Sequence, residues 1–457
     1  MNKITPRSLL LLPLSRILLM SVIALGCNLS AQAQEVITLP QAIERMLGNN
    51  LNIKQGALNV ATSNVNLQQS KAALYPSLNA STDGRLGFGR SRIENSFEVV
   101  NNKTFSSSGN VGTSVDLFGG FAKVNQIKQN KLLLQADNSN LDKIKNDLVL
   151  DVVIAYMDVV YNEDLLRVSE QQLLVSEQTL KRENALMDVG NKTMADISQA
   201  KAQVATSELN VTNAQNALTI SYLTLSQLME MGTDTHTFKV VAPTVKEIEL
   251  ARTTYNVNEV YNDALKTFPD IKLAALNSEA AEKGIDIAKG SLYPTLSLNA
   301  GIGSNYVYVF DSPAPLPGFS DQVNDNFNQY IGLSLRIPIF NGLTAKSNVK
   351  RARINYEGYK IQEQLTKNNL NKVIAQAVAD LKAAESRYVS TQNTFNAQRD
   401  AFIVIEQRYN VGLVNSLDYN TAITNRNEAE VDFIQAKYDL LFRSKVIDYY
   451  LGKQITF

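Results

Sequence analysis

The chain has 457 residues, with 44 basic and 44 acidic side chains, one histidine and one cysteine. A net charge of zero provides no field that would attract nucleic acid, so no nucleic-acid partner is predicted. Zinc sites of the Cys/His type need several ligands, which Cys27 and His236 alone cannot supply. A catalytic triad would have to use His236, which lies in a Thr-rich segment typical of a loop. The sequence therefore predicts no cofactor and no metal site.

The N-terminal residues 1–33 have the features of a secretory signal peptide. Basic residues precede the apolar run 17–25, and the small residues of 31–33 fit cleavage after Ala33. Cys27 follows Leu-Gly in a pattern that weakly resembles a lipoprotein processing site. We expect Cys27 to be removed with the signal peptide; the alternative is that it carries lipid as the mature N-terminus.

The remaining chain consists of two copies of one unit of roughly 200 residues, a period that marks an internal repeat. Three short motifs recur between the copies: Leu-Tyr-Pro recurs after 218 positions, and two motifs further along the chain recur after 222 positions. These marks are Tyr75-Pro76 with Tyr293-Pro294, Phe118-Gly119-Gly120 with Phe340-Asn341-Gly342, and Val189-Gly190 with Val411-Gly412. The change of four positions predicts a longer loop in the second copy, at the Pro-rich residues 311–320.

Each copy is predicted to contain a helix, two strands, a very long helix, a tight turn and a second long helix. The first copy spans 34–240, with a strand pair at 77–117 and long helices at 119–188 and 193–230. A linker at 241–256 leads to the second copy, 257–457, with a strand pair at 295–339 and long helices at 343–410 and 415–450.

The long helices are predicted from a seven-residue repeat of apolar side chains. Residues 121–189 contain neither glycine nor proline. The repeat in this segment comprises Val159, Leu166, Leu173, Leu180 and Met187. Such a period favours helices that supercoil around neighbours. A helix of about 70 residues would be roughly 105 Å long and needs partners along its whole length.

The turns between the long helices have strong local signals. Gly190 and Gly412 can adopt the left-handed conformation that ends a helix. Thr193-x-x-Asp196 and Asn415-x-x-Asp418 then have the form of capping boxes that begin the next helices. These residues suit any helical hairpin, so the glycines and caps alone do not distinguish a functional tip from an ordinary turn.

The strands alternate apolar and polar residues, which predicts one apolar and one wet face. Each is long enough to cross a membrane at a tilt. Aromatic residues stand where helix and strand meet, as in an interfacial girdle: Tyr75, Phe118, Tyr293 and Phe340. Four strands cannot close a barrel, and open sheet edges are not tolerated in lipid. The predicted fold is therefore an α+β membrane protein: a trimeric 12-stranded β-barrel, four strands per chain, continued by a long periplasmic α-helical coiled-coil barrel.

The duplication, the two Leu-Tyr-Pro and two Phe-x-Gly marks, and Val-Gly-x-x-x-x-x-Asp at each tip together resemble the TolC-like outer membrane efflux proteins. The resemblance covers essentially the whole mature chain. It implies a homotrimer in the outer membrane whose helical tube crosses the periplasm. It also implies a periplasmic adaptor and an inner-membrane transporter as partners. The chain would then be the passive exit duct of a tripartite export system.

The resemblance also assigns roles to residues at the tips. Asp418 matches a position that forms an acidic ring at the periplasmic gate, and Asp196 matches one that hydrogen-bonds to the equivalent of Tyr409. The adaptor would dock on the tip turns, which comprise Val189, Gly190, Thr193, Val411, Gly412 and Asn415. Val414 and Thr421 replace an arginine and an acid found in some members, so we expect a looser lock and a weaker cation-binding gate.

Several alternatives stay open at this stage. Efflux of small toxic compounds is the favoured cargo, with type I protein secretion and metal-ion efflux as alternatives. A soluble periplasmic coiled-coil scaffold would share the helices and the signal peptide, yet it would not need two matched pairs of amphipathic strands. An enzyme is not favoured, because the sequence has no phosphate-binding loop, metal-ligand cluster or nucleophile elbow.

Overall fold

A computed structural model describes residues 35–92, 99–232, 238–244, 251–252, 254–310, 316–453 and 455. The predicted signal peptide, Cys27 and His236 lie outside the described residues, as do parts of the predicted linker and of the predicted Pro-rich loop.

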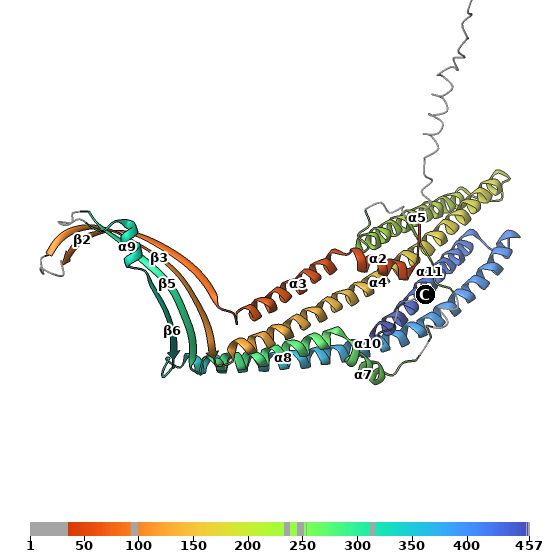
Figure 1. The fold of residues 1–457 in the computed structure, drawn as a ribbon. Helices are drawn as coiled ribbons and strands as arrows, with labels where there is room; N and C mark the ends of the chain where they lie inside the picture. Colours follow the sequence, from red (N-terminus) through yellow and green to blue (C-terminus); the bar gives the residue numbers. More distant parts are fainter. Residues whose placement is uncertain are drawn as a thin grey trace, which may run out of the picture.

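The molecule is elongated, with the strands at one end and two helical hairpins at the other (Figure 1). The first repeat contains β1 (Glu35–Ile37), α2 (Leu39–Asn49), α3 (Leu51–Ala72), β2 (Ser77–Arg92), β3 (Val99–Gly119), α4 (Ala122–Asp188), α5 (Met194–Leu228) and β4 (Phe238–Val240). The second contains α7 (Val257–Thr267), α8 (Pro269–Gly290), β5 (Thr295–Val309), α9 (Phe319–Asp325), β6 (Asn328–Arg336), α10 (Thr344–Asn410) and α11 (Ser416–Tyr450). The helices α4 and α10 have 67 residues each, or about 100 Å at 1.5 Å per residue.

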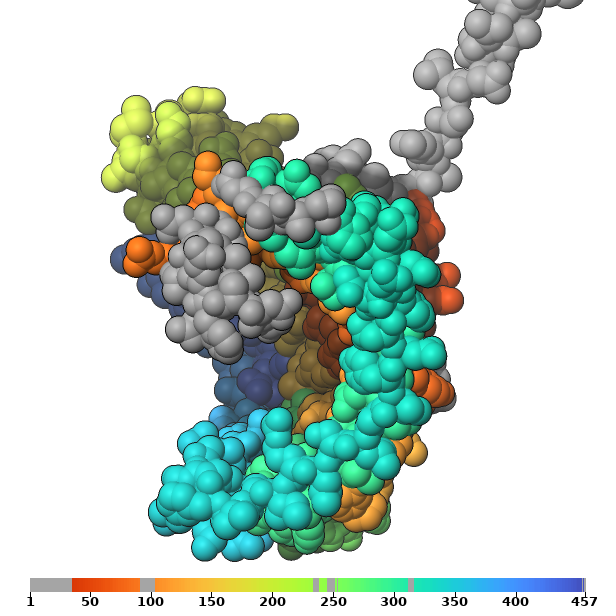
Figure 2. Space-filling model, turned by 60° about the vertical axis from the view of Figure 1, so that its left-hand side comes forward, coloured from red at the N-terminus to blue at the C-terminus, as the bar shows by residue number. Residues whose placement is uncertain are grey.

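The four long strands form one antiparallel sheet in the order β2-β3-β5-β6. Strands β2 and β6 are its edges. Pairing places Leu78 opposite Thr113, Thr113 opposite Ala300 and Ala300 opposite Ile331, so residues of one alternation share one face. The surface of β5, α9 and β6 curves around a hollow at this end of the molecule (Figure 2).

The junctions from strand to long helix differ from the sequence-based boundaries. Helices α4 and α10 begin at Ala122 and Thr344, not at 119 and 343, because two left-handed residues precede each helix. Gly120 (φ 59°) is followed by Phe121 (φ 60°), and Gly342 (φ 60°) by Leu343 (φ 63°). A left-handed conformation is unfavourable for Phe and Leu. Two such residues in succession turn the chain sharply out of the sheet, which a simple glycine cap does not predict.

A β-bulge adds a second correction at the end of β3. The pairing shifts between Asp116 and Phe118, so that Phe118 stands opposite Leu296. A bulge inserts one extra residue and reverses the alternation beyond it. The bulge therefore moves Phe118 to the apolar face that Val111 and Thr113 occupy further along the strand. Simple alternation would have placed Leu117 there.

The remaining differences are local. The helix predicted before each strand pair is two helices, broken at Asn50 and at Phe268–Pro269. The last strand ends at Arg336, although it was predicted to extend to residue 339. Pro338 explains the early end, because proline has no backbone N–H to donate to a neighbouring strand. A short parallel pair, β1 with β4, is an addition, because strands of three residues are too short to show a period.

The main hydrophobic core surrounds this short β1–β4 pair, where α4, α5, α7, α10 and α11 meet. Tyr156 of α4 is fully buried there. Its hydroxyl lies 3.0 Å from the carbonyl oxygens of Ile37 and Val241 and accepts a hydrogen bond from Val241 N–H at 2.8 Å. One side chain thus connects the start of the described chain and the end of the first repeat to the long helix α4.

Between this core and the first tip, the buried residues of α4 are polar, whereas α5 contributes the buried apolar residues Ile197 and Ala200. From residue 169 onward, the buried residues of α4 recur at heptad spacing and are Ser169, Gln172, Ser176, Thr179 and Glu183. Ser176 and Ser207 of α5 have their hydroxyl oxygens 3.0 Å apart. The predicted heptad leucines of this segment, Leu166, Leu173 and Leu180, are only half-buried beside this row. Among the described helices, none is both long and apolar enough to cross a membrane.

Replacing Tyr156 by Phe is expected to destabilise the core region by roughly 1–3 kcal/mol, because buried backbone groups lose their partner. Hydrogen exchange of residues 35–37 and 238–241 should accelerate. Tyr359→Phe is the matched control, since Tyr359 is exposed and its hydroxyl makes no hydrogen bond within the described residues. Unchanged exchange in Tyr156→Phe would contradict the assigned role.

Candidate functional site

The two hairpin tips have the same backbone geometry. Gly190 (φ 79°) and Gly412 (φ 77°) adopt the left-handed conformation expected from the sequence. At the first tip, Gly190 N–H donates to Met187 O and Asn191 N–H to Leu186 O. Gly412 and Leu413 repeat these bonds at the second tip. This pair of bonds is the Schellman motif, which satisfies the last carbonyls of each long helix.

The two capping acids behave differently, although the sequence presents them as equivalents. At Thr193 the capping box is complete: Asp196 accepts from Thr193 N–H at 3.0 Å, and Thr193 Oγ1 accepts from Asp196 N–H at 3.3 Å. At Asn415 only half forms, with Asn415 Oδ1 accepting from Asp418 N–H at 2.8 Å. The carboxylate of Asp418 is exposed and makes no ion pair or hydrogen bond within the described residues. Of the two capping acids, only Asp418 therefore has a free carboxylate within the described residues.

Lys192, in the turn of the first hairpin, joins that hairpin to the second. Its Nζ donates to Ser416 Oγ at 2.6 Å and to Tyr409 OH at 3.1 Å. The same nitrogen lies 3.4 Å from Glu183 Oε2, and Glu183 is only 1% exposed. Neither carboxylate oxygen of Glu183 has a hydrogen-bond partner within the described residues, so Lys192 is its charge partner.

A second contact between the hairpins places a cation of the first hairpin over stacked rings of the second. Tyr409 and Tyr419 stack with ring centroids 4.2 Å apart and an interplanar angle of 4°. The guanidinium of Arg182, from the first hairpin, lies 4.6 Å from the Tyr409 centroid and donates to Asn410 Oδ1. A desolvated cation over an aromatic ring is attracted by about 2 kcal/mol. We call Arg182, Glu183, Lys192, Tyr409, Ser416 and Tyr419 the tip latch.

The predicted Asp196–Tyr409 hydrogen bond is replaced by an indirect connection. Asp196 is held by Thr193 and also interacts with Ser416, while Tyr409 OH contacts Lys192 and Ser416. Hydrogen bonds from Thr193 and then Ser416 lower the pKa of Asp196 to about 2. The two residues are thus brought together, with Ser416 between them.

Sequence reasoning missed Lys192, although one signal was present. Lys192 occupies the position in the first repeat that Val414 occupies in the second. Val414 packs against the apolar cluster of Phe402, Tyr419 and Ile423. The cation absent from the second tip is therefore present in the first. No such signal was present for Arg182, Glu183 and Tyr419. On a long helix, residues of these types are usual at the surface or between packed helices.

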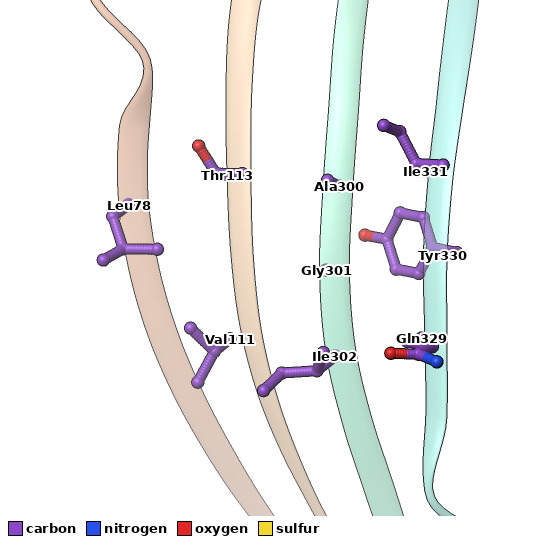
Figure 3. A pocket seen from close by; sticks show the side chains of 9 residues that line it. All are labelled: Leu78, Val111, Thr113, Ala300, Gly301, Ile302, Gln329, Tyr330 and Ile331. Carbon is purple, nitrogen blue, oxygen red and sulfur yellow. The ribbon is translucent and has the colours of Figure 1, made fainter.

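At the opposite end of the molecule, one face of the sheet is apolar and exposed. A shallow hollow of about 530 Å³ lies on it, with Leu78, Val111, Ile302 and Ile331 around the smaller Ala300 (Figure 3). The exposed apolar residues of this face include Leu78, Leu86, Phe88, Ile302, Ile331, Leu333 and Leu335. The residues that alternate with them are mostly Asn, Ser and Gly. Contiguous exposed apolar faces mark surfaces that contact a membrane or another protein.

The predicted girdle residues lie where the sheet meets the helices. Tyr75, Tyr293 and Phe340 are exposed, and Phe118 is half-buried with its ring 5.4 Å from that of Phe121. Their contact with a membrane interface stays a prediction. Within the described residues, no group of three or more His, Cys, Asp or Glu side chains is arranged to hold a metal ion.

The profile of the outer membrane efflux protein family matches residues 42–230 and 260–453, the two repeats. The chain belongs to the outer membrane efflux protein family. The family predicted from the repeat marks is thus confirmed, and with it the predicted location in the outer membrane.

Three relatives illustrate the similarity. The outer membrane efflux protein BepC of Brucella suis is 22% identical over 430 residues, which is 93% of this chain and 87% of BepC. Toxin and drug export protein A of Aggregatibacter actinomycetemcomitans is 21% identical over 415 residues, 88% of this chain and 83% of its own. The crystal structure of outer membrane protein VceC from Vibrio cholerae matches with a TM-score of 0.75 at 18% identity, covering 91% of this chain and 96% of VceC. This likeness shows the fold.

Replacing Lys192 by Met is expected to loosen the tip, because it leaves the Glu183 charge buried without a partner. Breaking a buried ion pair in this way costs roughly 3–5 kcal/mol. Hydrogen exchange of residues 180–188 should accelerate in Lys192→Met and recover in Lys192→Met/Glu183→Gln. Lys201→Met, at an exposed position of α5, is the control. Equal exchange in the single and double variants would refute the ion-pair role.

The contribution of Asp196 to the tip should be insensitive to mild acid. Its folded pKa is lowered to about 2, so its stabilising effect is complete above the ordinary value near 3.8 and is lost as the pH falls through 2. The difference in tip protection between the wild type and Asp196→Asn should stay constant from pH 8 to about pH 5. A difference that fades between pH 7 and pH 5 would contradict this assignment.

Proposed function

We propose that three copies of this chain close into an outer-membrane exit duct, which passively conducts substrates delivered by a periplasmic adaptor and an inner-membrane transporter. The observation that carries the proposal is the four-stranded sheet, whose apolar face is exposed and whose edge strands β2 and β6 pair with nothing further in the described chain. In lipid an open edge leaves backbone groups unsatisfied. Twelve strands from three copies would remove every edge and enclose a polar lumen.

The flanks of the helical part support the same closure. Helix α8 contacts both α4 and α10, so α3 and α10 remain as the outer flanks of the subunit. Each flank carries exposed apolar residues at helical spacing: Leu51, Leu58 and Val65 on α3, and Ile354, Ile361 and Leu365 on α10. A second copy would bury the α3 stripe against the α10 stripe, which is the knobs-into-holes packing that a seven-residue spacing favours.

The hairpin tips fit a docking surface for the adaptor. The tip turns expose Val189, Met194, Val411, Leu413 and Leu417, each about two-thirds exposed. These apolar side chains surround the turns at Gly190 and Gly412. Apolar residues clustered at the end of a long helical rod are typical of a protein interface. In our proposal the adaptor covers them.

The tips also form the periplasmic gate. In a trimer, three Asp418 carboxylates would form an acidic ring, since the carboxylate is free in the subunit. Like charges in a narrow wet ring repel one another and attract cations. The tip latch would hold the two hairpins of each subunit together and keep the gate narrow, while the absence of a cation at Val414 leaves the contact between subunits looser.

Efflux of small toxic compounds is the proposed cargo. Toxin and drug export protein A is named for both toxins and drugs, so toxin export is the second candidate. A duct makes few specific contacts with its cargo. The choice of substrate therefore rests with the transporter.

The decisive experiment is membrane fractionation followed by the native mass of the detergent-extracted mature protein. An outer-membrane species of three copies is expected. A monomer or dimer in the soluble periplasmic fraction would refute the duct and favour the coiled-coil scaffold.

Replacing Asp418 by Asn should lower the cation selectivity of the purified trimer in a planar bilayer and weaken its block by divalent cations, because the ring loses its charge. Asp188→Asn, at an exposed position before the first tip, is the matched control. The wild type itself is expected to close incompletely. A wild-type trimer that closes tightly and is strongly blocked by divalent cations would contradict the prediction of a weakly held gate.

A further inference from the structure

The internal repeat relates one strand pairing of the chain to another. Adding 218 to a residue of β2 and 222 to a residue of β3 converts the β2–β3 pairing into the β5–β6 pairing. Ser77 opposite Ser114 becomes Thr295 opposite Arg336, and Arg85 opposite Ser106 becomes Gly303 opposite Asn328. All nine pairs of β5 with β6 follow this relation. The two halves of the sheet are therefore copies in hydrogen-bond register as well as in sequence.

The same relation determines the pairing across the unpaired edges. Between the two halves, β3 pairs with β5. The copy of β3 in the second half is β6, and the copy of β5 in the first half is β2. We infer that β6 of one subunit pairs with β2 of the next in the register that the β3–β5 pair defines. This inference rests on the proposed trimer and specifies its seam.

The seam register follows from the observed pairs. Ser114 pairs with Asn299 and Gly112 with Gly301. Arg336 therefore stands opposite Ser81 of the partner subunit, and Ser334 opposite Asp83 of the partner subunit. In the same way Tyr330 stands opposite Gly87 of the partner subunit, because Ser108 pairs with Asn305. The seam extends over nine pairs, from Asn328 to Arg336, which is the full length of β6.

The faces of the two strands agree in this register. On the apolar face, Ile331 stands opposite Leu86 of the partner subunit, and both side chains are exposed in the single chain. A register shifted by one residue would place polar residues beside them on the lipid side. On the lumen face, Tyr330 already lies over Gly301, whose added Cβ would come within 2.9 Å of its ring.

The register also pairs two charges. Arg336 and Asp83 are exposed lumen-face residues, and neither makes an ion pair within the described residues. Across the seam, Arg336 would lie diagonally beside Asp83 of the partner subunit. Diagonal neighbours in an antiparallel pair are about 7–8 Å apart at Cα, within reach of a long Arg side chain. The seam would thus link each subunit to the next by a lumen-facing ion pair.

Cysteine cross-linking tests the register directly, because Cys27 precedes the predicted cleavage site and the rest of the chain has no cysteine. Cα atoms of directly opposite residues are about 4.5–5.5 Å apart, within the range of a disulfide. Ser334→Cys/Asp83→Cys should form covalent dimers and trimers under oxidation. The control, Ser334→Cys/Asn79→Cys, lies four residues out of register, about 13 Å along the strand. Its yield should be at least roughly ten-fold lower, given the distance limit on disulfides.

A second measurement avoids disulfides. Arg336→Asp and Asp83→Arg should each lower the fraction of protein that stays trimeric after detergent extraction, and the double variant should restore it. A trimer that cross-links through Asn79 instead of Asp83, or through neither, overturns the register and leaves the duct intact. A protein whose native mass is not that of three copies overturns the duct as well as the seam.

Discussion

The structure of this protein depends on one constraint, which is that a strand in lipid has no water with which to hydrogen-bond. A sheet with an apolar face can enter a membrane only when both of its edges are paired. The four strands of this chain have an exposed apolar face and two edges, so the subunit is incomplete as it stands. Closure by further copies is the physical solution that needs no additional segment.

The helices must be compatible with the same closure, so that the neighbours of the sheet edges are also the neighbours of the outer helices. Helices of 67 residues bury too little surface when isolated, and here they contact one another in sequence across the subunit from α3 to α10. The apolar stripes left on α3 and α10 lie at the two flanks of this row. Strand edges and helix flanks therefore face the same neighbours. One closed ring would satisfy both, which is why the barrel and the helical tube belong to one object.

Duplication explains why the two hairpins share one backbone geometry, and divergence between the copies gives their tips different side chains. At equivalent positions of the two turns, the carboxylate of Asp196 is hydrogen-bonded and that of Asp418 is free. It carries a cation at Lys192 and an apolar residue at Val414. Near the first tip, the buried residues of α4 are polar, whereas the second hairpin contains the stacked Tyr409 and Tyr419. One hairpin thus provides the charges that bind the other, and the other presents the exposed carboxylate.

Much of this was determined by the sequence alone. The Tyr-Pro marks ended helices and began strands, the seven-residue repeat predicted the long helices, and the alternation predicted a sheet with one apolar face. These are local properties, governed by backbone preference and by the period with which side chains meet one face. The family, the fold and the outer-membrane location followed from them.

Only the tertiary structure decided what depends on residues distant in the chain. Lys192 meets Tyr409 across 217 positions, and Tyr156 meets Val241 across 85. A pattern search also could not find the left-handed Phe121 and Leu343, the bulge before Phe118 or the buried polar row of α4. A period reports which face of an element is apolar. It does not report which charge lies opposite which ring, because that depends on how the two hairpins pack against each other.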